Sequence, residues 1–137
     1  MSNSNRYILS IAGLDPSGGA GLLADVKVFE NHGLIGLGIA TSITYQNESE
    51  FSGIKWLDSS EIINQLKPLS RYPLRAVKIG LIENLEILRD LVLEIKHAFP
   101  EAKVIWDPIF KASAGFTFHE HLNSALLKEI LENIYCV

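Results

Sequence analysis

The chain has 137 residues, of which 47% are apolar and 20% charged, and its 12 basic and 16 acidic side chains give a formal net charge of −4. This length allows one domain with a real hydrophobic core, and this composition excludes a disordered protein. The absence of a basic block argues against nucleic acid as a partner. There is no run of eighteen apolar residues and no signal peptide, so we expect a soluble, cytoplasmic protein with no membrane partner. A single cysteine, Cys136, excludes an intramolecular disulfide, and we expect it to be buried as a small hydrophobe.

Strands and helices are predicted to alternate along the chain. Short apolar runs predict strands, and apolar residues at three- and four-residue spacing predict helices. The predicted strands cover residues 7–12, 34–45, 76–79 and 104–106. The predicted helices are marked by Leu22, Val26 and Phe29; by Ile62, Ile63, Leu66 and Leu69; by Leu85, Leu88, Val92, Ile95 and Phe99; and by Leu122, Leu126, Leu127, Ile130 and Leu131.

Particular residues mark where several of the predicted helices begin or end. Asp58 and Glu61 have the spacing of a capping box at the start of the second helix, which Pro68 should kink or end. Gly33 is a plausible stop for the first helix. After the last helix the residues turn apolar again, which predicts a further strand in which the chain ends. We therefore expect the first part of a larger domain.

This alternation favours an α/β fold, with a mostly parallel sheet flanked by helices. Ligands of such sheets bind beyond the carboxyl ends of the strands. Glycine, carboxylate and amide residues follow the predicted strands at those ends: Gly13, Asp15, Gln46, Asn47, Gly80 and Asp107. The pattern predicts a small-molecule site at that edge of the sheet.

The first strand is followed by a segment that we call the glycine loop, residues 13–21. Glycines before a helix can hold an anion, but a P-loop is excluded because Gly19 stands where its lysine should be. A dinucleotide pattern fits formally through Gly19, Gly21 and Ala24, yet its acidic partner is missing because Gln46 lies near that place. A ligand site and a tight strand-to-helix turn both remain open for this loop.

Other polar residues have both a functional and a structural interpretation. Asp25 can accept a hydrogen bond from a ligand, or be a solvated or capping carboxylate of the first helix. Gln46 can bind the edge of a heterocycle or its own loop backbone. Asp107 can hold Mg²⁺ or lie in a simple turn. His119 and His121 are two residues apart, which disfavours a shared metal on one helical face.

Four segments together closely resemble the hydroxymethylpyrimidine/phosphomethylpyrimidine kinases of thiamine biosynthesis, which are ribokinase-like enzymes. These segments are residues 8–25, 41–47, 78–80 and 106–109. The resemblance implies a ribokinase-like fold, of which residues 1–137 are the N-terminal part of a single domain. It also implies ATP- and Mg²⁺-dependent phosphorylation of 4-amino-5-hydroxymethyl-2-methylpyrimidine and then of its monophosphate, by a protein that forms homodimers.

The same resemblance implies roles for particular residues. The residues of the pyrimidine pocket are Gly13, Ala20, Asp25, Gln46, Leu81 and Ile109. Among them, Asp25 and Gln46 bind the pyrimidine, with Gln46 at its polar edge, and Leu81 and Ile109 form apolar walls. Asp107 lies near the transferred phosphoryl group and its metal.

The sequence departs from the family in two respects. Lys111 is displaced from the lysine that often follows Asp-Pro in the family, so we give it no role. The family is also about twice as long, and its second half carries the anion hole, the catalytic base and most of the ATP site. We therefore expect a chain truncated before the C-terminal half, without catalytic residues and inactive alone. A pyridoxine or pyridoxal kinase and a non-catalytic pyrimidine-binding fragment are the alternatives.

Overall fold

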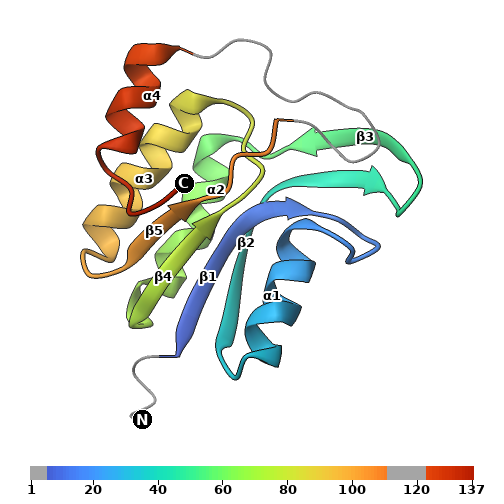
Figure 1. The fold of residues 1–137 in the computed structure, drawn as a ribbon, viewed down its shortest axis with the longest axis horizontal. Helices are drawn as coiled ribbons and strands as arrows, with labels where there is room; N and C mark the ends of the chain where they lie inside the picture. The colour runs from blue at the N-terminus through green and yellow to red at the C-terminus, as the bar shows by residue number, and fades with distance from the viewer. Residues whose placement is uncertain (1–5, 111–122) are drawn as a thin grey trace.

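A mostly parallel sheet forms the centre of the computed structural model, which describes residues 6–110 and 123–137 (Figure 1). Its strands within that part of the chain are β1 (Tyr7–Leu14), β2 (Ile35–Gln46), β3 (Phe51–Trp56), β4 (Leu74–Ile79) and β5 (Lys103–Trp106). They lie in the order β3-β2-β1-β4-β5, and every neighbouring pair is parallel except β2–β3. The predicted α/β fold with a mostly parallel sheet is confirmed.

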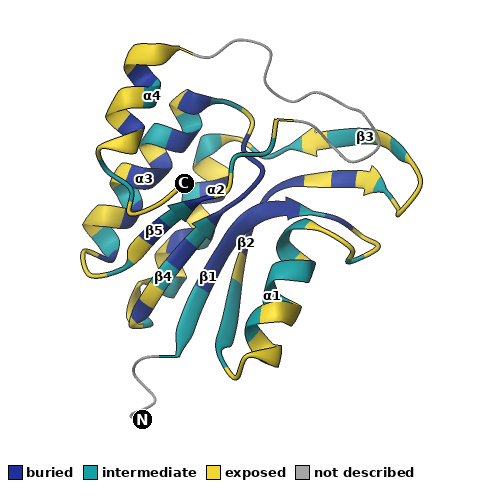
Figure 2. Cartoon of the chain, viewed as in Figure 1, coloured by how far each residue is buried: buried dark blue, intermediate teal, exposed yellow. Residues whose placement is uncertain are grey.

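Helices cover both faces of this sheet. They are α1 (Gly21–Asn31), α2 (Ser59–Leu66), α3 (Leu85–Ala98) and α4 (Ser124–Leu131), with a 3-10 helix (Lys67–Arg71) after α2. Figure 1 shows α1 on one face, and α2 and α3 on the other. The core lies on the second face, where fully buried side chains of the strands, such as Leu9, Ile11 and Val77, join those of α2, α3 and α4 (Figure 2). No helix of the described residues is long and apolar enough to cross a membrane.

The local start and stop signals act as predicted. The backbone N–H of Glu61 donates to Asp58 Oδ1 and that of Asp58 donates to Glu61 Oε2, both at 2.8 Å, which completes the capping box of α2. The α-helix ends at Leu66 and continues as a 3-10 helix that contains Pro68, because proline has no N–H for the helical pattern. Gly33 has a φ of +73° just after α1.

The sequence did not predict β3, an antiparallel strand at the edge of the sheet. Its residues are half-buried or exposed, so they lack the continuous apolar run of the buried strands. The connection from β2 depends on Asn47, whose side-chain oxygen accepts hydrogen bonds from the N–H groups of Ser49 and Glu50 at 3.0 and 2.9 Å. An asparagine turn between two strands was the signal that could have revealed the hairpin.

The segment after α4 pairs with β5. Tyr135 N–H donates to the carbonyl of Val104 at 2.8 Å, and Trp106 N–H donates to that of Cys136 at 2.9 Å, in a parallel bridge. This pairing agrees with the strand predicted there. The expectation that Cys136 is buried is wrong, because its thiol is exposed on the outer edge of the sheet.

Candidate active site

Asp15 organises the glycine loop at the carboxyl end of β1. Its side chain is buried, with 4% exposed. Oδ1 accepts hydrogen bonds from the N–H and hydroxyl of Ser17 at 2.8 and 2.7 Å, and Oδ2 accepts one from Ala20 N–H at 3.0 Å. Burial by itself would raise the pKa of Asp15, but these hydrogen bonds outweigh it and hold the pKa below its usual value. The sequence marked Asp15 only as a strand-end residue, although a serine two positions later is typical of such a turn.

The loop is a tight turn in which three backbone amides are already hydrogen-bonded. The N–H groups of Ser17 and Ala20 point to the Asp15 carboxylate, and that of Gly18 donates to the Asp15 carbonyl at 3.0 Å. Gly21 has a φ of +60°, and a Cβ on it would lie 2.3 Å from the carbonyl oxygen of Gly13. These observations favour the tight-turn interpretation over an anion cradle, because a phosphate needs amides that are free.

Asp25 is neither a capping nor a solvated carboxylate. It follows the first turn of α1, and only 13% of its side chain is exposed. Its Oδ2 accepts a hydrogen bond from the Ser10 hydroxyl at 2.7 Å, and its Oδ1 accepts one from Lys78 Nζ at 2.6 Å. The carboxylate is therefore fixed between α1 and the sheet.

Lys78 links Asp25 to Asp107. Its Nζ lies 3.4 Å from Asp107 Oδ2, and 27% of the Lys78 side chain and 56% of the Asp107 side chain are exposed. Asp107 directly follows β5, and its N–H donates to the carbonyl of Ile79 at 2.8 Å. The structure thus brings Asp25 and Asp107 together through a lysine to which the sequence gave no role.

The small and apolar residues of the expected pocket lie around the ends of β1 and β4. A Cβ on Gly13 would lie 3.0 Å from Leu81 Cδ2, so these two residues are direct neighbours. The Thr41 hydroxyl donates to the carbonyl of Leu81 at 2.6 Å, which fixes that segment. Ile109 is half-buried, and its Cδ1 would lie 3.9 Å from a Cβ on Gly80.

Gln46 and Ala20 lie at the rim of the same edge. Gln46 is the last residue of β2 and is half-buried, and Ala20 is exposed. Within the described residues the side-chain amide of Gln46 has no hydrogen-bond partner, because Asn47 makes the loop contacts instead. No hydrogen bond or ion pair joins Gln46 to Asp25 in that part of the chain.

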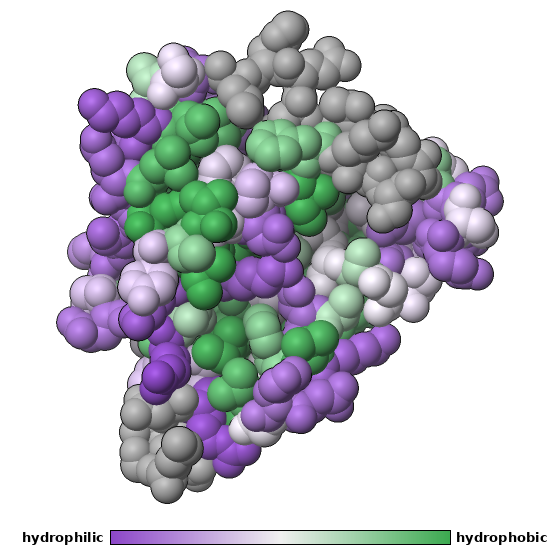
Figure 3. All heavy atoms as spheres, viewed as in Figure 1, coloured by the Kyte–Doolittle hydropathy of each residue, from purple (hydrophilic) through white to green (hydrophobic). Residues whose placement is uncertain are grey.

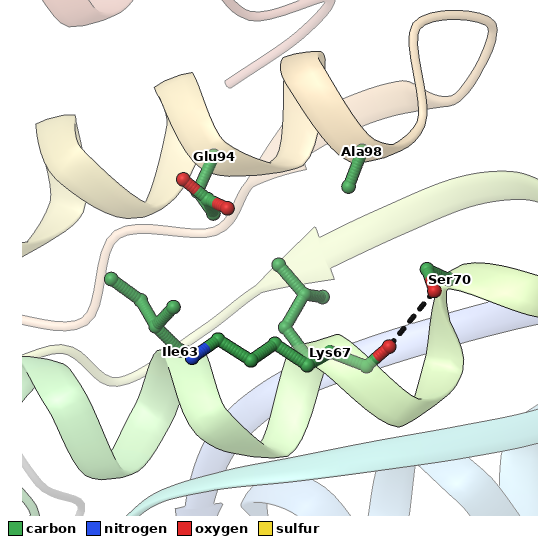
Figure 4. Close-up of a pocket in the computed structure, with 6 residues that line it drawn as sticks. Ile63, Lys67, Ser70, Glu94 and Ala98 are labelled. Atoms are coloured by element: carbon green, nitrogen blue, oxygen red, sulfur yellow. Dashed lines mark hydrogen bonds between the residues drawn. The ribbon is translucent and has the colours of Figure 1, made fainter.

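Two further features do not belong to this edge. A groove of about 270 Å³ lies between α2 and α3, and its lining includes Ile63, Lys67 and Glu94 but no predicted site residue (Figure 4). Lys111, His119 and His121 lie outside the described residues. Across residues 6–110 and 123–137, no group of three or more histidine, cysteine or acidic side chains could hold a metal ion.

A family model described as "Phosphomethylpyrimidine kinase" matches residues 15–137. The chain belongs to the phosphomethylpyrimidine kinase family. This match covers the glycine loop from Asp15 onward together with Asp25, Gln46 and Asp107. The resemblance stated from the sequence is therefore confirmed, and the family is one of kinases.

Characterised relatives of the family are longer than this chain. The hydroxymethylpyrimidine/phosphomethylpyrimidine kinase of Aquifex aeolicus is 33% identical over 108 residues, which are 78% of this chain and 42% of the relative. That of Bacillus subtilis is 32% identical over 125 residues, which are 90% and 45%. The chain thus spans about half the length of the curated relatives that it matches.

Solved structures show the same fold. The phosphomethylpyrimidine kinase of Clostridium difficile has a TM-score of 0.73 and 32% identity, and the match covers 93% of this chain and 52% of that one. The pyridoxal kinase of Staphylococcus aureus has a TM-score of 0.72 and 25% identity, with 94% and 45% covered. The fold is ribokinase-like, as expected.

Proposed function

We propose that the natural polypeptide carrying these residues uses ATP to phosphorylate 4-amino-5-hydroxymethyl-2-methylpyrimidine, and then its monophosphate, in thiamine biosynthesis. The observation that carries the proposal is the family match over residues 15–137, combined with the gathering of the strand-end residues at one edge of the sheet. Residues 1–137 would then be the N-terminal part of one ribokinase-like domain. Exposed apolar side chains near α4 and the chain end, including Leu131 and Val137, support a further covering layer (Figure 3).

The pyrimidine is recognised by an amide and a carboxylate. A glutamine amide has both a donor and an acceptor, which suits an aminopyrimidine edge that also has both. The amide of Gln46 has no protein partner within the described residues, so no hydrogen bond inside the protein is lost when it binds. Asp25 uses one acceptor position on each oxygen, which leaves others for a ligand amine or hydroxyl. Leu81 and Ile109 provide the apolar walls, and Gly13 and Ala20 line the pocket from the glycine loop.

Asp107 is the residue that would hold Mg²⁺. Its carboxylate is 56% exposed, and Mg²⁺ typically binds one or two carboxylates together with water and substrate phosphates, so a single aspartate fits. When bound, the ion would neutralise charge on the transferred phosphoryl group. In the glycine loop the N–H groups of Ser17 and Ala20 already bind Asp15, so we place the anion hole, the base and most ATP contacts in the half of the relatives that this chain does not match.

An assay of phosphoryl transfer tests this function. With ATP and Mg²⁺, the natural polypeptide should convert the hydroxymethylpyrimidine to its monophosphate and then to its diphosphate. The reaction is monitored by ³¹P NMR. The 137-residue chain alone should show negligible turnover, because the groups that stabilise the transferring phosphoryl are not among its site residues. Robust turnover by the 137-residue chain would contradict this division of the site. Absence of turnover by a folded natural polypeptide would contradict the function.

A second candidate is a pyridoxal kinase, which the Staphylococcus aureus neighbour favours at a TM-score of 0.72. Competition between pyridoxal and the hydroxymethylpyrimidine separates the two functions. We expect the pyrimidine to have the larger kcat/KM, since the relatives with about one-third identity are named for it. If the chain binds the pyrimidine but its natural polypeptide transfers no phosphoryl group, the non-catalytic alternative holds.

We also propose a homodimer, in the cytoplasm. Ile43 and Tyr45 of β2 are 39% and 50% exposed, and β3 is an edge strand of the sheet that the described residues form. Exposed edge strands next to apolar side chains commonly pair with another chain. The free thiol of Cys136 fits a reducing compartment. Light scattering of the natural polypeptide should give twice the monomer mass, and Tyr45→Lys should reduce it to the monomer mass.

A further inference from the structure

One half-buried cation contacts both acidic residues of the proposed site. Lys78 Nζ lies 2.6 Å from Asp25 Oδ1 and 3.4 Å from Asp107 Oδ2. The Ser10 hydroxyl completes the group through Asp25 Oδ2 at 2.7 Å. These four side chains come from four different places in the fold: β1, α1, β4 and the end of β5. Neither Lys78 nor Ser10 is part of the pyrimidine pocket described above.

The register of the sheet explains why Lys78 reaches Asp25. Ser10 of β1 is paired with Lys78 of β4, so their side chains lie side by side on the face that α1 covers. Glycines of β2 allow α1 to approach this face closely. A Cβ on Gly36 would lie 3.1 Å from Val26 Cγ1, and one on Gly38 would lie 2.6 Å from Leu22 Cδ1. The close approach brings Asp25 over the Ser10–Lys78 pair.

The charges of this group depend on one another. Two carboxylates face one ammonium, and the side chain of Asp25 is the most buried of the three. A partly buried carboxylate loses hydration, so it needs donors that are fixed in place. Without Lys78, Asp25 would keep only the neutral Ser10 hydroxyl, and its carboxylate could rotate away from the ligand.

We propose that Lys78 is a positioning residue of the pyrimidine site, and this inference rests on the proposed function. Its ammonium holds Oδ1 of Asp25 while Ser10 holds Oδ2, so that the unused acceptor positions of the carboxylate face the substrate. The same ammonium limits repulsion between Asp25 and Asp107. Lys78 itself touches neither substrate nor the reacting atoms in this role.

Calorimetric titration of the chain with the hydroxymethylpyrimidine, without ATP, tests the role. Lys78→Met should raise Kd about tenfold or more while the thermal melt stays cooperative, which is the size expected for loss of a charged hydrogen-bond partner. Lys78→Arg keeps the charge and should recover binding to within about threefold of the wild type. Lys103→Met is the matched control, because Lys103 lies on the neighbouring strand and contacts the Tyr135 ring instead. Its Kd should not change.

A second variant and a second measurement cover the case in which Lys78→Met does not fold. Lys78→Gln removes the ammonium charge and shortens the side chain but stays polar. Side-chain couplings in NMR should show one Asp25 χ1 rotamer in the wild type and rotamer averaging in this variant. If Lys78→Met or Lys78→Gln binds as tightly as the wild type while Asp25→Asn loses binding, the inference is overturned and the proposed function remains. If the folded wild-type chain binds no pyrimidine, this inference is overturned, whereas the proposed function is decided separately by phosphoryl transfer in the natural polypeptide.

Discussion

Two aspartates near the carboxyl edge of the sheet are held in opposite ways. Asp15 is bound by donors within five residues of it in the sequence, mainly backbone N–H groups. Asp25 is bound by Ser10 and by Lys78, which is 53 residues away in the sequence. The first arrangement is local and closes a turn, whereas the second exists only once the sheet and α1 have assembled. The comparison indicates that Asp15 maintains the turn, and we propose a binding role for Asp25.

The largest effect is expected from Gly21→Ala, which breaks the turn that Asp15 closes. Its φ is +60° and its new Cβ would meet the Gly13 carbonyl oxygen at 2.3 Å, so backbone must move. Urea denaturation should show a loss of about 2–4 kcal/mol, the sum of backbone strain and a steric clash. Gly33→Ala is the control, because its φ is +73° but nothing lies within 4 Å. It should cost only about 1 kcal/mol, and equal losses in both variants would contradict the argument from contact.

Removal of the Asp15 carboxylate should have the next largest effect. Asp15→Ala leaves the N–H groups of Ser17 and Ala20 without their acceptor, and we expect a loss of about 1–3 kcal/mol in the free energy of unfolding. Asp90→Ala removes an exposed aspartate paired with Arg89, which should cost less than about 1 kcal/mol. A loss for Asp15→Ala as small as that for Asp90→Ala would show that the loop does not depend on Asp15.

A smaller effect concerns pH and follows from the lowered pKa of Asp15. A carboxyl group whose pKa is lower in the folded state stabilises the protein fully above its unfolded pKa, near pH 4. This contribution is lost as the pH falls through the folded value. The fall in unfolding free energy between neutral pH and about pH 3 should therefore be smaller in Asp15→Asn than in the wild type. An identical fall in both proteins would mean that Asp15 does not contribute to acid unfolding.

The smallest effect on stability is expected when Ser10, the neutral hydrogen-bond partner of Asp25, is replaced. Ser10→Ala removes one hydrogen bond to Asp25 but leaves Lys78 in place, so we expect a loss of about 1 kcal/mol. Pyrimidine binding should weaken less than in Lys78→Met, measured by the same titration. If Ser10→Ala weakened binding more than Lys78→Met does, the hydroxyl and not the ammonium would be the main support of Asp25.

The sequence predicted the structural features that depend on residues close together in the chain. The apolar stripe of α3, the capping box of Asp58 and Glu61, and the buried parallel strands all rest on short-range patterns, and all are present. The edge strand β3 was missed because it is partly exposed and has no continuous apolar run. Lys78 was missed because its partner is 53 residues away, and only the register of β1 and β4 reveals it.

In the candidate site, too, the sequence predicted some features and only the structure revealed others. The residues themselves marked Asp25, Gln46 and Asp107, and the resemblance supplied their roles. The residues alone could not decide between a capping and a binding role for Asp25. Its low exposure and long-range partners in the structure remove the capping interpretation. The roles of Gln46, Gly13, Ala20, Leu81 and Ile109 toward a pyrimidine remain predictions, and so does that of Asp107 toward Mg²⁺.

Titration of the purified chain with 4-amino-5-hydroxymethyl-2-methylpyrimidine, together with a thermal melt, tests the central claim most directly. We predict a cooperative melt, binding by the wild type, and loss of binding in Gln46→Ala without a change in the melt, because the Gln46 amide has no partner in the described structure. Asn64→Ala, an exposed amide on α2 outside the site, should bind normally. A cooperative melt without binding by the wild type, or binding that survives in Gln46→Ala, would contradict the pyrimidine site proposed here.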